Sequence, residues 1–469
     1  MLWRRPTSLQ KCSLPELITN RIAIMNNKKV ITGFSKLSKM GKIRWLVENF
    51  FKDPELVMRE LMSYWHHDEE QQKLLEGFTE NTITNYPMPY CVAPNFLING
   101  RTYVVPMVIE ESSVVAAASS AAKFWLERGG IKTEVLGTKK VGQVHFTWPG
   151  NLEKLQSVFP ELEKALRKDA APITANMEKR GGGIVDIQLV DMSSEEEGYY
   201  QLKATFETCD SMGANFINSV LEQFSKTLDQ FLASHPVFEE KERDLTIIMA
   251  ILSNFTPECL VRASVECKIE ELGTFAGGMD ARTFANKFYK AVRIAHLDPY
   301  RATTHNKGIF NGIDAVVLAT GNDFRAVEAC GHTFAAKDGQ YRSLSHCTID
   351  KGVFRFWLEV PLALGTVGGL TSLHPMAKRS LELLGNPSAE ELMQVVAAVG
   401  LAQNFAALRS LVTTGIQSGH MKMHLTNILI QLGASEKEAA AIREMFRDKT
   451  ISFTAVREAL ENLRSEVQV

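Results

Sequence analysis

Alternating apolar and polar positions predict a β-hairpin close to residue 100. The alternation covers residues 89–109 and is interrupted by Asn99-Gly100, a pair that favours a tight two-residue turn. Residues 112–128 are rich in alanine and are predicted to form a helix that ends at Gly129-Gly130. Residues 44–76 also have a helical, charged pattern.

The pattern is clearest between residues 137 and 257. Residues 210–232 are strongly amphipathic, with large apolar side chains near one stripe. The expected elements are strand, helix, strand, strand, helix and strand, at 141–148, 151–167, 183–192, 199–209, 210–232 and 244–255. This order is typical of the split βαβ, ferredoxin-like fold, so we predict a compact inserted domain.

The remaining pattern mixes helices and strands. We expect helices at 281–295, 323–336, 375–384 and 388–411, and strands at 341–348 and 353–360. The segment around Lys307 is predicted to be a loop with glycine-rich turns, followed by a short apolar strand or buried helix at 313–318. Three more helical segments follow in the tail, at 420–432, 437–446 and 454–464, separated by glycines that suit a hinged module.

These elements predict an α+β protein. Its large mixed domain would consist of residues 25–136 and 258–414, interrupted by the inserted domain at 137–257 and followed by a small helical flap at 415–469. Residues 1–24 are interpreted as an extension or tail, because Met25 begins a polar segment that resembles a natural start.

Composition narrows the class of protein. The chain has 469 residues, of which 45% are hydrophobic and 23% are charged, as in soluble globular proteins. Its net charge of -2 favours neither nucleic acid nor an anionic membrane, and we see no apolar run of about 18 residues that would span a bilayer. The seven cysteines contain no CxxC pair, so we expect reduced thiols in the cytoplasm.

Lys307 and Asp323 are the first candidates for chemistry. Lys307 is surrounded by small and polar residues, and Asp323 follows the apolar run. A lysine and a carboxylate on either side of a buried segment favour a pocket. The alternative is a solvated loop lysine, which is the commoner role of a single lysine.

Two carboxylates, Glu110 and Glu111, come directly after the second strand of the hairpin and before a helix. The helix dipole favours negative charge at that place, so a purely structural role is one interpretation. The other is that a side chain at a strand-to-helix junction faces a cleft.

Two glycine-containing turns could approach a ligand. Residues 210–215, Asp-Ser-Met-Gly-Ala-Asn, join a strand to a helix whose free N–H groups favour a phosphate, and Asp210 could cap that helix. Residues 365–369, Gly-Thr-Val-Gly-Gly, form either a plain turn or a passage for a ligand. No Rossmann GxGxxG pattern follows any predicted strand.

His420 and His424 lie one helical turn apart near the C-terminus. That spacing can bind metal, but HExxH is absent and no acidic partner follows. A histidine on a hinged segment is better suited to act as an acid late in a reaction.

Together and in this order, the motifs resemble hydroxymethylglutaryl-CoA reductase, specifically the class II enzymes of bacteria and archaea. The resemblance covers roughly residues 81–432. Its blocks are ENTITNYPMPY, NFLING, PMVIEESSVVAAAS, DSMGANFINS, DPYRATTHNKGIFNGIDAVVLATGNDFRAVEA, GTVGG, VGLAQN and TTGIQSGHMKMH. The pattern DSMGAN, in place of the class I pattern DAMGMN, favours class II.

The resemblance implies residue roles. Catalysis would rest on Glu111, Lys307, Asp323 and His420. The inserted domain would bind NADPH or NADH through Asp210, Met212, Gly213, Ala214 and Asn215. Acyl-CoA would contact Ser113 and Arg301 at the glutaryl part, Gln403 and Asn404 near the CoA arm, and Asn311. Family members form the site across a dimer interface, close it with the C-terminal module and use no metal.

The implied chemistry suits these residue types. Two hydrides convert the thioester to mevalonate. Lys307 would stabilise the oxyanion of the first step, with Asp323 keeping the lysine charged and oriented. His420 would protonate the departing CoA thiolate, and Glu111 would supply a proton in the second reduction.

The sequence departs from the family pattern at two places. Ser112 stands where proline usually follows the catalytic glutamate. The aspartate that NADH-preferring members carry before the GGG turn is missing, and Lys179 and Arg180 are adjacent, so we expect a preference for NADPH. The alternatives left open are mevalonate oxidation by the same site and a catalytically silent acyl-CoA-binding homologue.

Overall fold

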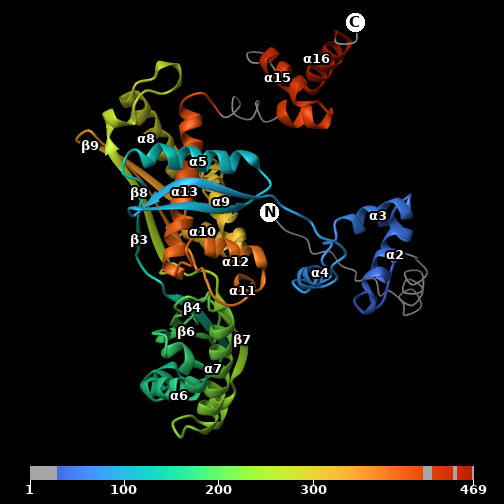
Figure 1. Cartoon of the computed structure of the whole chain (residues 1–469). Helices are drawn as coiled ribbons and strands as arrows, with labels where there is room; N and C mark the ends of the chain where they lie inside the picture. The colour runs from blue at the N-terminus through green and yellow to red at the C-terminus, as the bar shows by residue number, and fades with distance from the viewer. Residues whose placement is uncertain (1–28, 416–424, 447–450, 467–469) are drawn as a thin grey trace, which may run out of the picture. The chain divides into compact units, whose positions relative to one another are not determined.

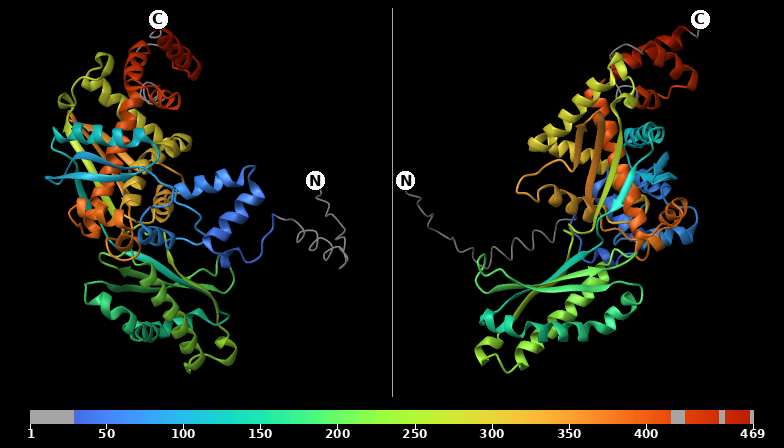
Figure 2. Two further views of the ribbon diagram at one scale, coloured as in Figure 1. Left: turned by 45° about the vertical axis from the view of Figure 1, so that its right-hand side comes forward. Right: turned by 90° about the vertical axis from the view of Figure 1, so that its left-hand side faces the viewer.

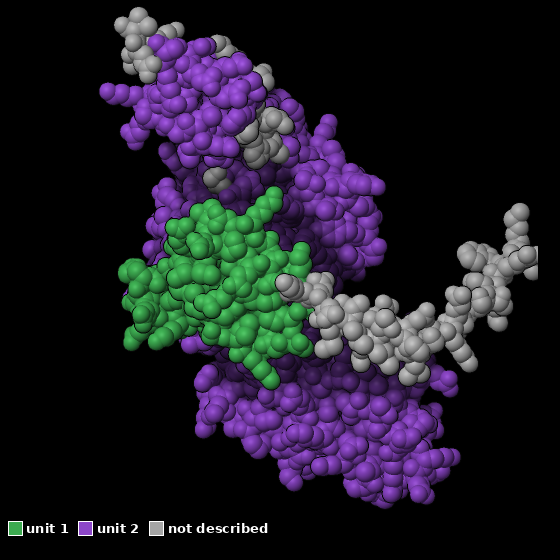
Figure 3. All heavy atoms as spheres, turned by 90° about the vertical axis from the view of Figure 1, so that its right-hand side faces the viewer, with its two compact units in different colours: residues 1–88 green, residues 89–469 purple. Residues whose placement is uncertain are grey.

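The computed structural model describes residues 29–415, 425–446 and 451–466. Residues 1–88 and 89–469 form two compact units (Figure 3). The first unit contains a short 3-10 helix, η1 (Phe34–Lys36), and three α-helices: α2 (Lys39–Phe50), α3 (Pro54–Ser63) and α4 (Glu69–Glu76). Lys39 lies 3.4 Å from the centre of the Trp65 ring and forms an ion pair with Glu76, which ties α2 to α4. The helical pattern at 44–76 is confirmed.

A single apolar helix, α13 (Ala389–Val412), is central to the core of the second unit. It packs against α5 (Ser112–Leu126), α8 (Ala281–Leu297) and α9 (Pro299–Ala319) (Figures 1 and 2). Its predicted capping box is present, because the Ser388 hydroxyl accepts the N–H of Glu391 and the Glu391 carboxylate accepts the N–H of Ser388. A helix that is apolar on nearly all sides belongs in a core.

By length and composition α13 is also a candidate membrane span, which our sequence analysis did not find. Its most apolar window is 78% buried inside the protein. That burial accounts for its hydropathy.

Two antiparallel sheets pack around this core. The hairpin of β1 (Tyr90–Ile98) and β2 (Arg101–Val108) is confirmed, with Asn99 and Gly100 at φ values of 48° and 83°, as a type I′ turn requires. The other sheet has the order β3-β8-β10-β9, with bounds Lys132–Val135, Leu260–Lys268, Val353–Pro361 and Ser345–Asp350. Strands β3 and β8 were missed from the sequence.

The segment between β3 and β8 forms a separate two-layer unit, in which helices cover one face of a sheet. Its four antiparallel strands have the order β5-β6-β4-β7, and helices α6 and α7 pack on one face (Figure 2). The bounds are β4 (Lys140–Thr147), α6 (Leu152–Glu178), β5 (Gly183–Asp191), β6 (Tyr199–Glu207), α7 (Ala214–Ser234) and β7 (Thr246–Ser253). The predicted element order is confirmed, although α6 continues beyond residue 167, where the predicted helix ended.

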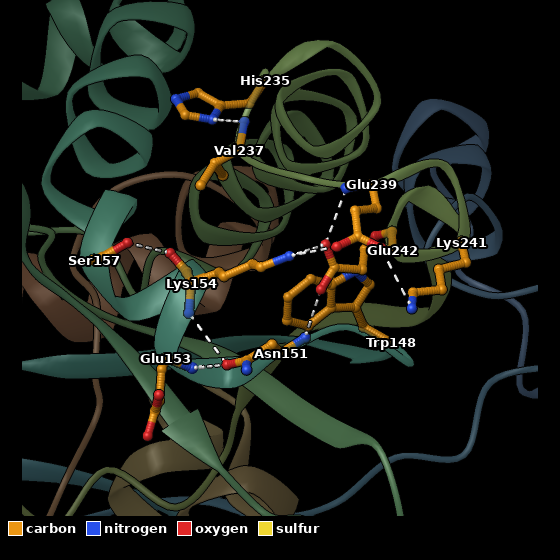
Figure 4. A network of polar contacts seen from close by, with 10 residues as sticks. All are labelled: Trp148, Asn151, Glu153, Lys154, Ser157, His235, Val237, Glu239, Lys241 and Glu242. Atoms are coloured by element: carbon orange, nitrogen blue, oxygen red, sulfur yellow. Dashed lines mark hydrogen bonds and ion pairs between the residues drawn. The ribbon is translucent and has the colours of Figure 1, made fainter.

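A buried carboxylate connects several segments at the end of this two-layer unit (Figure 4). Glu242, in the short helix η2 (Glu240–Arg243), is 5% exposed. Its carboxylate accepts hydrogen bonds from Lys154 Nζ at 2.7 Å and from the N–H groups of Glu239 and Asn151 at 2.9 and 3.2 Å. The Trp148 indole N–H donates to the Glu242 carbonyl at 2.5 Å. Lys154 first, and then the Glu239 N–H, lower the pKa of Glu242 to about 2.

We expect this carboxylate to make the folded state less stable as the solution becomes acidic. Its contribution is complete above the ordinary pKa of 4.5 and is lost as pH falls towards 2, because the folded state then has to take up the proton. At pH 6 the urea midpoint of Glu242→Gln should be lower than that of wild type. Between pH 5 and 2 the midpoint of the variant should fall less than that of wild type. Tryptophan fluorescence during unfolding measures this, with exposed Glu240→Gln as the control. Equal pH slopes in wild type and Glu242→Gln would contradict the assignment.

The second unit continues with α10 (Phe324–Ala335), α11 (Leu370–Leu373) and α12 (Pro375–Leu383). Short 3-10 helices, η3 (Ile269–Leu272) and η4 (Ala276–Gly278), precede α8. In the tail, residues 425–431 are helical and are followed by α15 (Glu436–Met445) and α16 (Phe453–Glu466). These tail helices share an apolar cluster that includes Leu429, Ile442 and Val456.

The largest correction concerns the predicted loop around Lys307. Residues 299–319 form one continuous helix, α9, so the prediction of a loop was wrong. Gly312 explains the error, because a Cβ there would lie 2.9 Å from Gln403 Cβ and 3.0 Å from the Val399 carbonyl. This glycine allows α9 and α13 to pack closely and does not mark a turn.

Candidate active site

Helix α9 places Lys307 on the wall of a cavity. The helix begins after Asp298, whose carboxylate accepts the N–H of Tyr300, and Pro299 occupies its first position. The Lys307 side chain is 64% exposed, and its Nζ lies 3.8 Å from Oε2 of Glu111. A cation and a carboxylate therefore face each other from two different elements.

Glu111 comes from the junction between β2 and α5. It occupies the N-cap position of α5, but its side chain makes no capping hydrogen bond. Instead the carboxylate accepts the Ser113 hydroxyl at 2.5 Å and faces Lys307. Of the two interpretations offered by the sequence, the geometry favours a carboxylate that faces a cleft.

The cavity has a volume of about 430 Å³ and is lined by α5, α9 and α13. It brings together seven residues that the sequence analysis singled out: Glu111, Ser113, Arg301, Lys307, Asn311, Gln403 and Asn404. We call this cavity the α9 pocket.

Positive charge dominates the α9 pocket. Arg301, Lys307 and Arg409 line it together with one carboxylate, Glu111. Burial lowers the pKa of both arginines. An arginine side chain nevertheless stays protonated in proteins, so both contribute positive charge. The pocket is therefore suited to an anionic ligand.

Arg409 was missed from the sequence. Its guanidinium donates to the Ser120 hydroxyl at 2.7 Å, which orients it at the pocket. A signal was present, because Arg409 is the one charged residue between positions 392 and 412.

A second cavity, of about 690 Å³, adjoins the first turn of α7. It is lined by Ser211, Met212, Gly213, Ala214, Asn215, Phe216, Leu318, Gly321, Asn322, Asp323, Phe324, Arg325, Gly365, Val367, Gly368, Gly369, Leu370 and Thr371. Four of the five predicted cofactor residues belong to it. We call it the α7 pocket.

Two glycines shape the α7 pocket. Gly213 is the N-cap of α7 at φ 91°, and a Cβ there would lie 2.5 Å from Thr208 Cγ2. A Cβ on Gly365 would lie 2.5 Å from the Met212 nitrogen. Both positions therefore require glycine, and the N-terminus of α7 offers unpaired N–H groups to an anion.

Asp210, the remaining predicted cofactor residue, has a structural position. Its carboxylate accepts the N–H of Ala389 at 2.8 Å, at the start of α13, and its carbonyl accepts the N–H of Thr366 at 2.8 Å. The expectation that Asp210 caps α7 was wrong, because Gly213 holds that position. Asp210 instead anchors the turn from which α7 begins.

A buried lysine forms hydrogen bonds to the same turn. Lys140 is 4% exposed, and its Nζ donates to the Thr208 hydroxyl at 2.5 Å and to the Ser211 carbonyl at 3.3 Å. The cation therefore fixes the backbone that precedes Gly213.

Comparisons with known proteins agree on one family. The profile of hydroxymethylglutaryl-coenzyme A reductase matches residues 46–425. The chain is 36% identical over 442 residues to 3-hydroxy-3-methylglutaryl-coenzyme A reductase of Archaeoglobus fulgidus, covering 93% of this chain and 95% of that protein. It is 33% identical to the probable enzyme of Borreliella burgdorferi, covering 94% of this chain and 99% of that protein.

A solved structure extends the agreement to three dimensions. The class II reductase of Streptococcus pneumoniae, bound to NADPH in open conformations, is 36% identical. It superimposes with a TM-score of 0.66, covering 88% of this chain and 100% of that one. The chain belongs to the hydroxymethylglutaryl-coenzyme A reductase family.

Within this reductase chain the four predicted catalytic residues do not meet. Glu111 and Lys307 share the α9 pocket, whereas Asp323 lines the α7 pocket. His420 lies outside the described residues. Helix α9 connects the two pockets, because Lys307 faces one and Leu318 the other, about 16 Å apart along the helix axis.

Asp323 pairs with an arginine, not with Lys307 of the same chain. Its carboxylate accepts N–H groups from the Arg325 guanidinium at 2.9 and 3.1 Å and from the backbone of Arg325 and Ala326, which caps α10. Burial raises the pKa of Asp323, but these contacts outweigh it and leave the pKa below its usual range. Asp323 is therefore a carboxylate at the wall of the α7 pocket.

A carboxyl pair between α9 and α10, Asp314 and Glu328, was also missed from the sequence. Burial first, and then Glu328, raise the pKa of Asp314 to about 8. Its buried Oδ1 has no hydrogen-bond partner among the described residues. The Asp314 carboxyl, which lies on α9 between Asn311 of one pocket and Leu318 of the other, therefore favours its protonated form.

Proposed function

We propose that the chain reduces (S)-3-hydroxy-3-methylglutaryl-CoA to mevalonate and CoA, consuming two NADPH, in the mevalonate pathway of isoprenoid synthesis. The observation that carries this proposal is the α9 pocket, where Lys307 and Glu111 lie 3.8 Å apart among the polar residues that the family resemblance assigns to acyl-CoA. The NADPH-bound state of the Streptococcus pneumoniae structure supports the choice of cofactor.

In the α9 pocket, the Lys307 ammonium provides a positive charge for the oxygen of the reacting carbonyl. When bound, the nicotinamide cofactor supplies the two hydrides. A fixed cation beside the developing oxyanion typically contributes about 3–4 kcal/mol of transition-state stabilisation. Arg301 is placed to pair with the carboxylate end of the acyl group.

Glu111 is the proton source that we assign to the second reduction. It faces Lys307 and is already hydrogen-bonded to Ser113, so its orientation is fixed before substrate enters. A general acid must lie within hydrogen-bond reach of the oxygen that it protonates. His420 is proposed to protonate the CoA thiolate, on the family resemblance.

The α7 pocket fits the dinucleotide. The free N–H groups at the start of α7 and the guanidinium of Arg325 provide sites for phosphate oxygens. The β5-β6-β4-β7 order and the two helices on one face support an inserted ferredoxin-like cofactor domain at residues 137–257. We assign residues 25–136 and 258–414 to the acyl-CoA domain and residues 415–469 to a flap.

We infer that the working form is a homodimer. Hydride transfer requires reacting atoms about 3–3.5 Å apart, whereas the nearest α9 residues of the two pockets in one chain, Asn311 and Leu318, are about 10 Å apart along the helix axis. A two-fold arrangement would bring the α7 pocket of one subunit, with its Asp323, to the α9 pocket of the other. The enzyme is assigned to the cytoplasm, in keeping with the six unpaired cysteines of the described residues.

Purified protein should oxidise NADPH only when HMG-CoA is added, with about two NADPH consumed per mevalonate. The ratio follows from a four-electron reduction by a two-electron donor. Absorbance of the reduced nicotinamide, with mevalonate measured by mass spectrometry, gives both quantities. No turnover with either NADPH or NADH would refute the reductase proposal.

Arg180 should set the preference for NADPH. It follows α6, and its carbonyl accepts the Cys209 thiol at 3.3 Å, one residue before the Asp210 turn. Arg180→Ala should raise the KM for NADPH about tenfold and leave the KM for NADH within about twofold, because a 2′-phosphate is present only in NADPH. Arg167→Ala, in the same domain, is the control. An equal effect of Arg180→Ala on both cofactors would remove Arg180 from this role.

A further inference from the structure

A histidine without an assigned role, His305, lies in the wall of the α9 pocket. His305 is 1% exposed and is nevertheless one of the residues that line this cavity. It lies one turn after Arg301 on α9 and one turn before Gly308, both of which also line the pocket. A Cβ on Gly308 would meet no atom within 4 Å, so open space adjoins this face of the helix.

One nitrogen of the His305 ring is firmly bound. Nε2 lies 2.7 Å from the Ser345 hydroxyl, and that hydroxyl donates to the Asn404 side-chain oxygen at 2.7 Å. Because the only proton of the Ser345 hydroxyl is directed to Asn404, the contact with His305 needs a proton on Nε2. The chain of three side chains therefore fixes the tautomer with the proton on Nε2.

The other nitrogen is unused. In that tautomer Nδ1 has a lone pair and no proton, and it has no hydrogen-bond partner among the described residues although it is fully buried. Burial, with Arg301 and His346, lowers the pKa of His305 to about 3, so the ring stays neutral at physiological pH. A buried acceptor without a donor is unfavourable, and pairing it with a ligand donor removes that cost.

We propose that Nδ1 of His305 accepts a hydrogen bond from an O–H or N–H donor of the bound acyl-CoA, and that Ser345 and Asn404 hold the ring in the tautomer that permits it. His305 is thus a substrate-binding residue, and Ser345 is a positioning residue that acts through it. The inference rests on the proposed acyl-CoA substrate. Two donors in that substrate have the required chemistry: the hydroxyl at C3 of the acyl group and the amide N–H groups of the pantetheine arm.

Two substitutions distinguish the roles of the two ring nitrogens of His305. His305→Gln can place an amide N–H where Nε2–H donates to Ser345, but it has no atom at the position of Nδ1. His305→Asn can place an amide group near the position of Nδ1, but it is too short to reach Ser345. Thermal unfolding of both variants checks that they fold.

Titration calorimetry of the full-length protein without nicotinamide measures binding without turnover. The ligands are HMG-CoA, 3-methylglutaryl-CoA, which lacks the hydroxyl, and CoA. We expect His305→Gln to bind HMG-CoA about 10- to 100-fold more weakly than wild type, with a smaller loss in His305→Asn. If the donor is the hydroxyl, His305→Gln changes the affinity for HMG-CoA alone. If the donor is an amide, it weakens all three ligands alike.

Nitrogen NMR of histidine-labelled wild-type protein supplies a readout that needs no variant. The resonance of an unprotonated Nδ1 should move upfield when HMG-CoA binds. An unchanged resonance with HMG-CoA bound, or a folded His305→Gln that binds all three ligands as wild type does, would overturn the assignment of His305 alone. Wild-type protein that binds none of the three ligands would instead overturn the proposed function, and this inference with it.

Discussion

A Lys307→Ala variant should lose about two to three orders of magnitude in turnover of HMG-CoA. The loss is expected because the ammonium is the group of the α9 pocket that we place beside the developing oxyanion, with Glu111 at 3.8 Å. Steady-state assays with saturating NADPH measure kcat, and calorimetry measures the affinity for HMG-CoA. The effect should fall mainly on kcat, because the charge matters most in the transition state.

The fold of this variant should be intact. Lys307 is 64% exposed at the side chain and lies within a regular helix, where alanine is the most favourable residue. Lys290→Ala, on the exposed face of α8, is the matched control and should be active. Activity of Lys307→Ala within about fivefold of wild type would remove Lys307 from its role as the oxyanion cation.

An Asp323→Asn variant should lose about two orders of magnitude in turnover. In the proposed dimer this carboxylate approaches the Lys307 ammonium of the partner subunit and stabilises its charge. Asparagine is nearly as good an N-cap as aspartate, so α10 should persist. The ion pair with Arg325 is largely exposed to solvent, so its loss should change stability little.

The control for this variant is Arg325→Ala. It breaks the same ion pair and leaves the Asp323 carboxylate in place. If Asp323 acts on the partner's lysine, Arg325→Ala should retain most of its kcat at saturating NADPH, although its KM for NADPH should rise because Arg325 also lines the α7 pocket. Equal losses in kcat for Asp323→Asn and Arg325→Ala would mean that Asp323 acts only by holding Arg325.

The fold was predictable where one local pattern determines the structure. The hairpin turn at Asn99-Gly100, the capping box at Ser388 and the amphipathic α7 each follow from residues close in sequence. The error at α9 has a different origin. Gly312 has its packing partner on α13, roughly ninety residues away, and no local pattern reveals that contact.

The sequence predicted which residues line the two pockets, but not how those residues are arranged and paired. The predicted substrate residues do line the α9 pocket, and four of five predicted cofactor residues line the α7 pocket. The placement of Asp210 against Ala389 and of Asp323 beside Arg325 depends on tertiary packing. Arg409 was missed in an apolar stretch of helix and His305 in a polar one, because packing decides which side chain reaches the cavity.

The central claim is that one active site takes Lys307 from one subunit and Asp323 from the other. Co-expressing Lys307→Ala and Asp323→Asn chains with different affinity tags, and purifying the species that carries both tags, gives a mixed dimer. One of its two sites then carries both substitutions and the other carries neither, so it should recover about half of the wild-type kcat per dimer.

The matched control combines Lys307→Ala with Glu111→Gln. These two residues lie in one pocket of one chain, so each site of that mixed dimer keeps one defect and should stay inactive. The decisive measurement is therefore the activity of the Lys307→Ala and Asp323→Asn mixed dimer. Recovery to about half of wild type is the predicted result, and an activity no higher than that of the two parent variants would contradict the shared site.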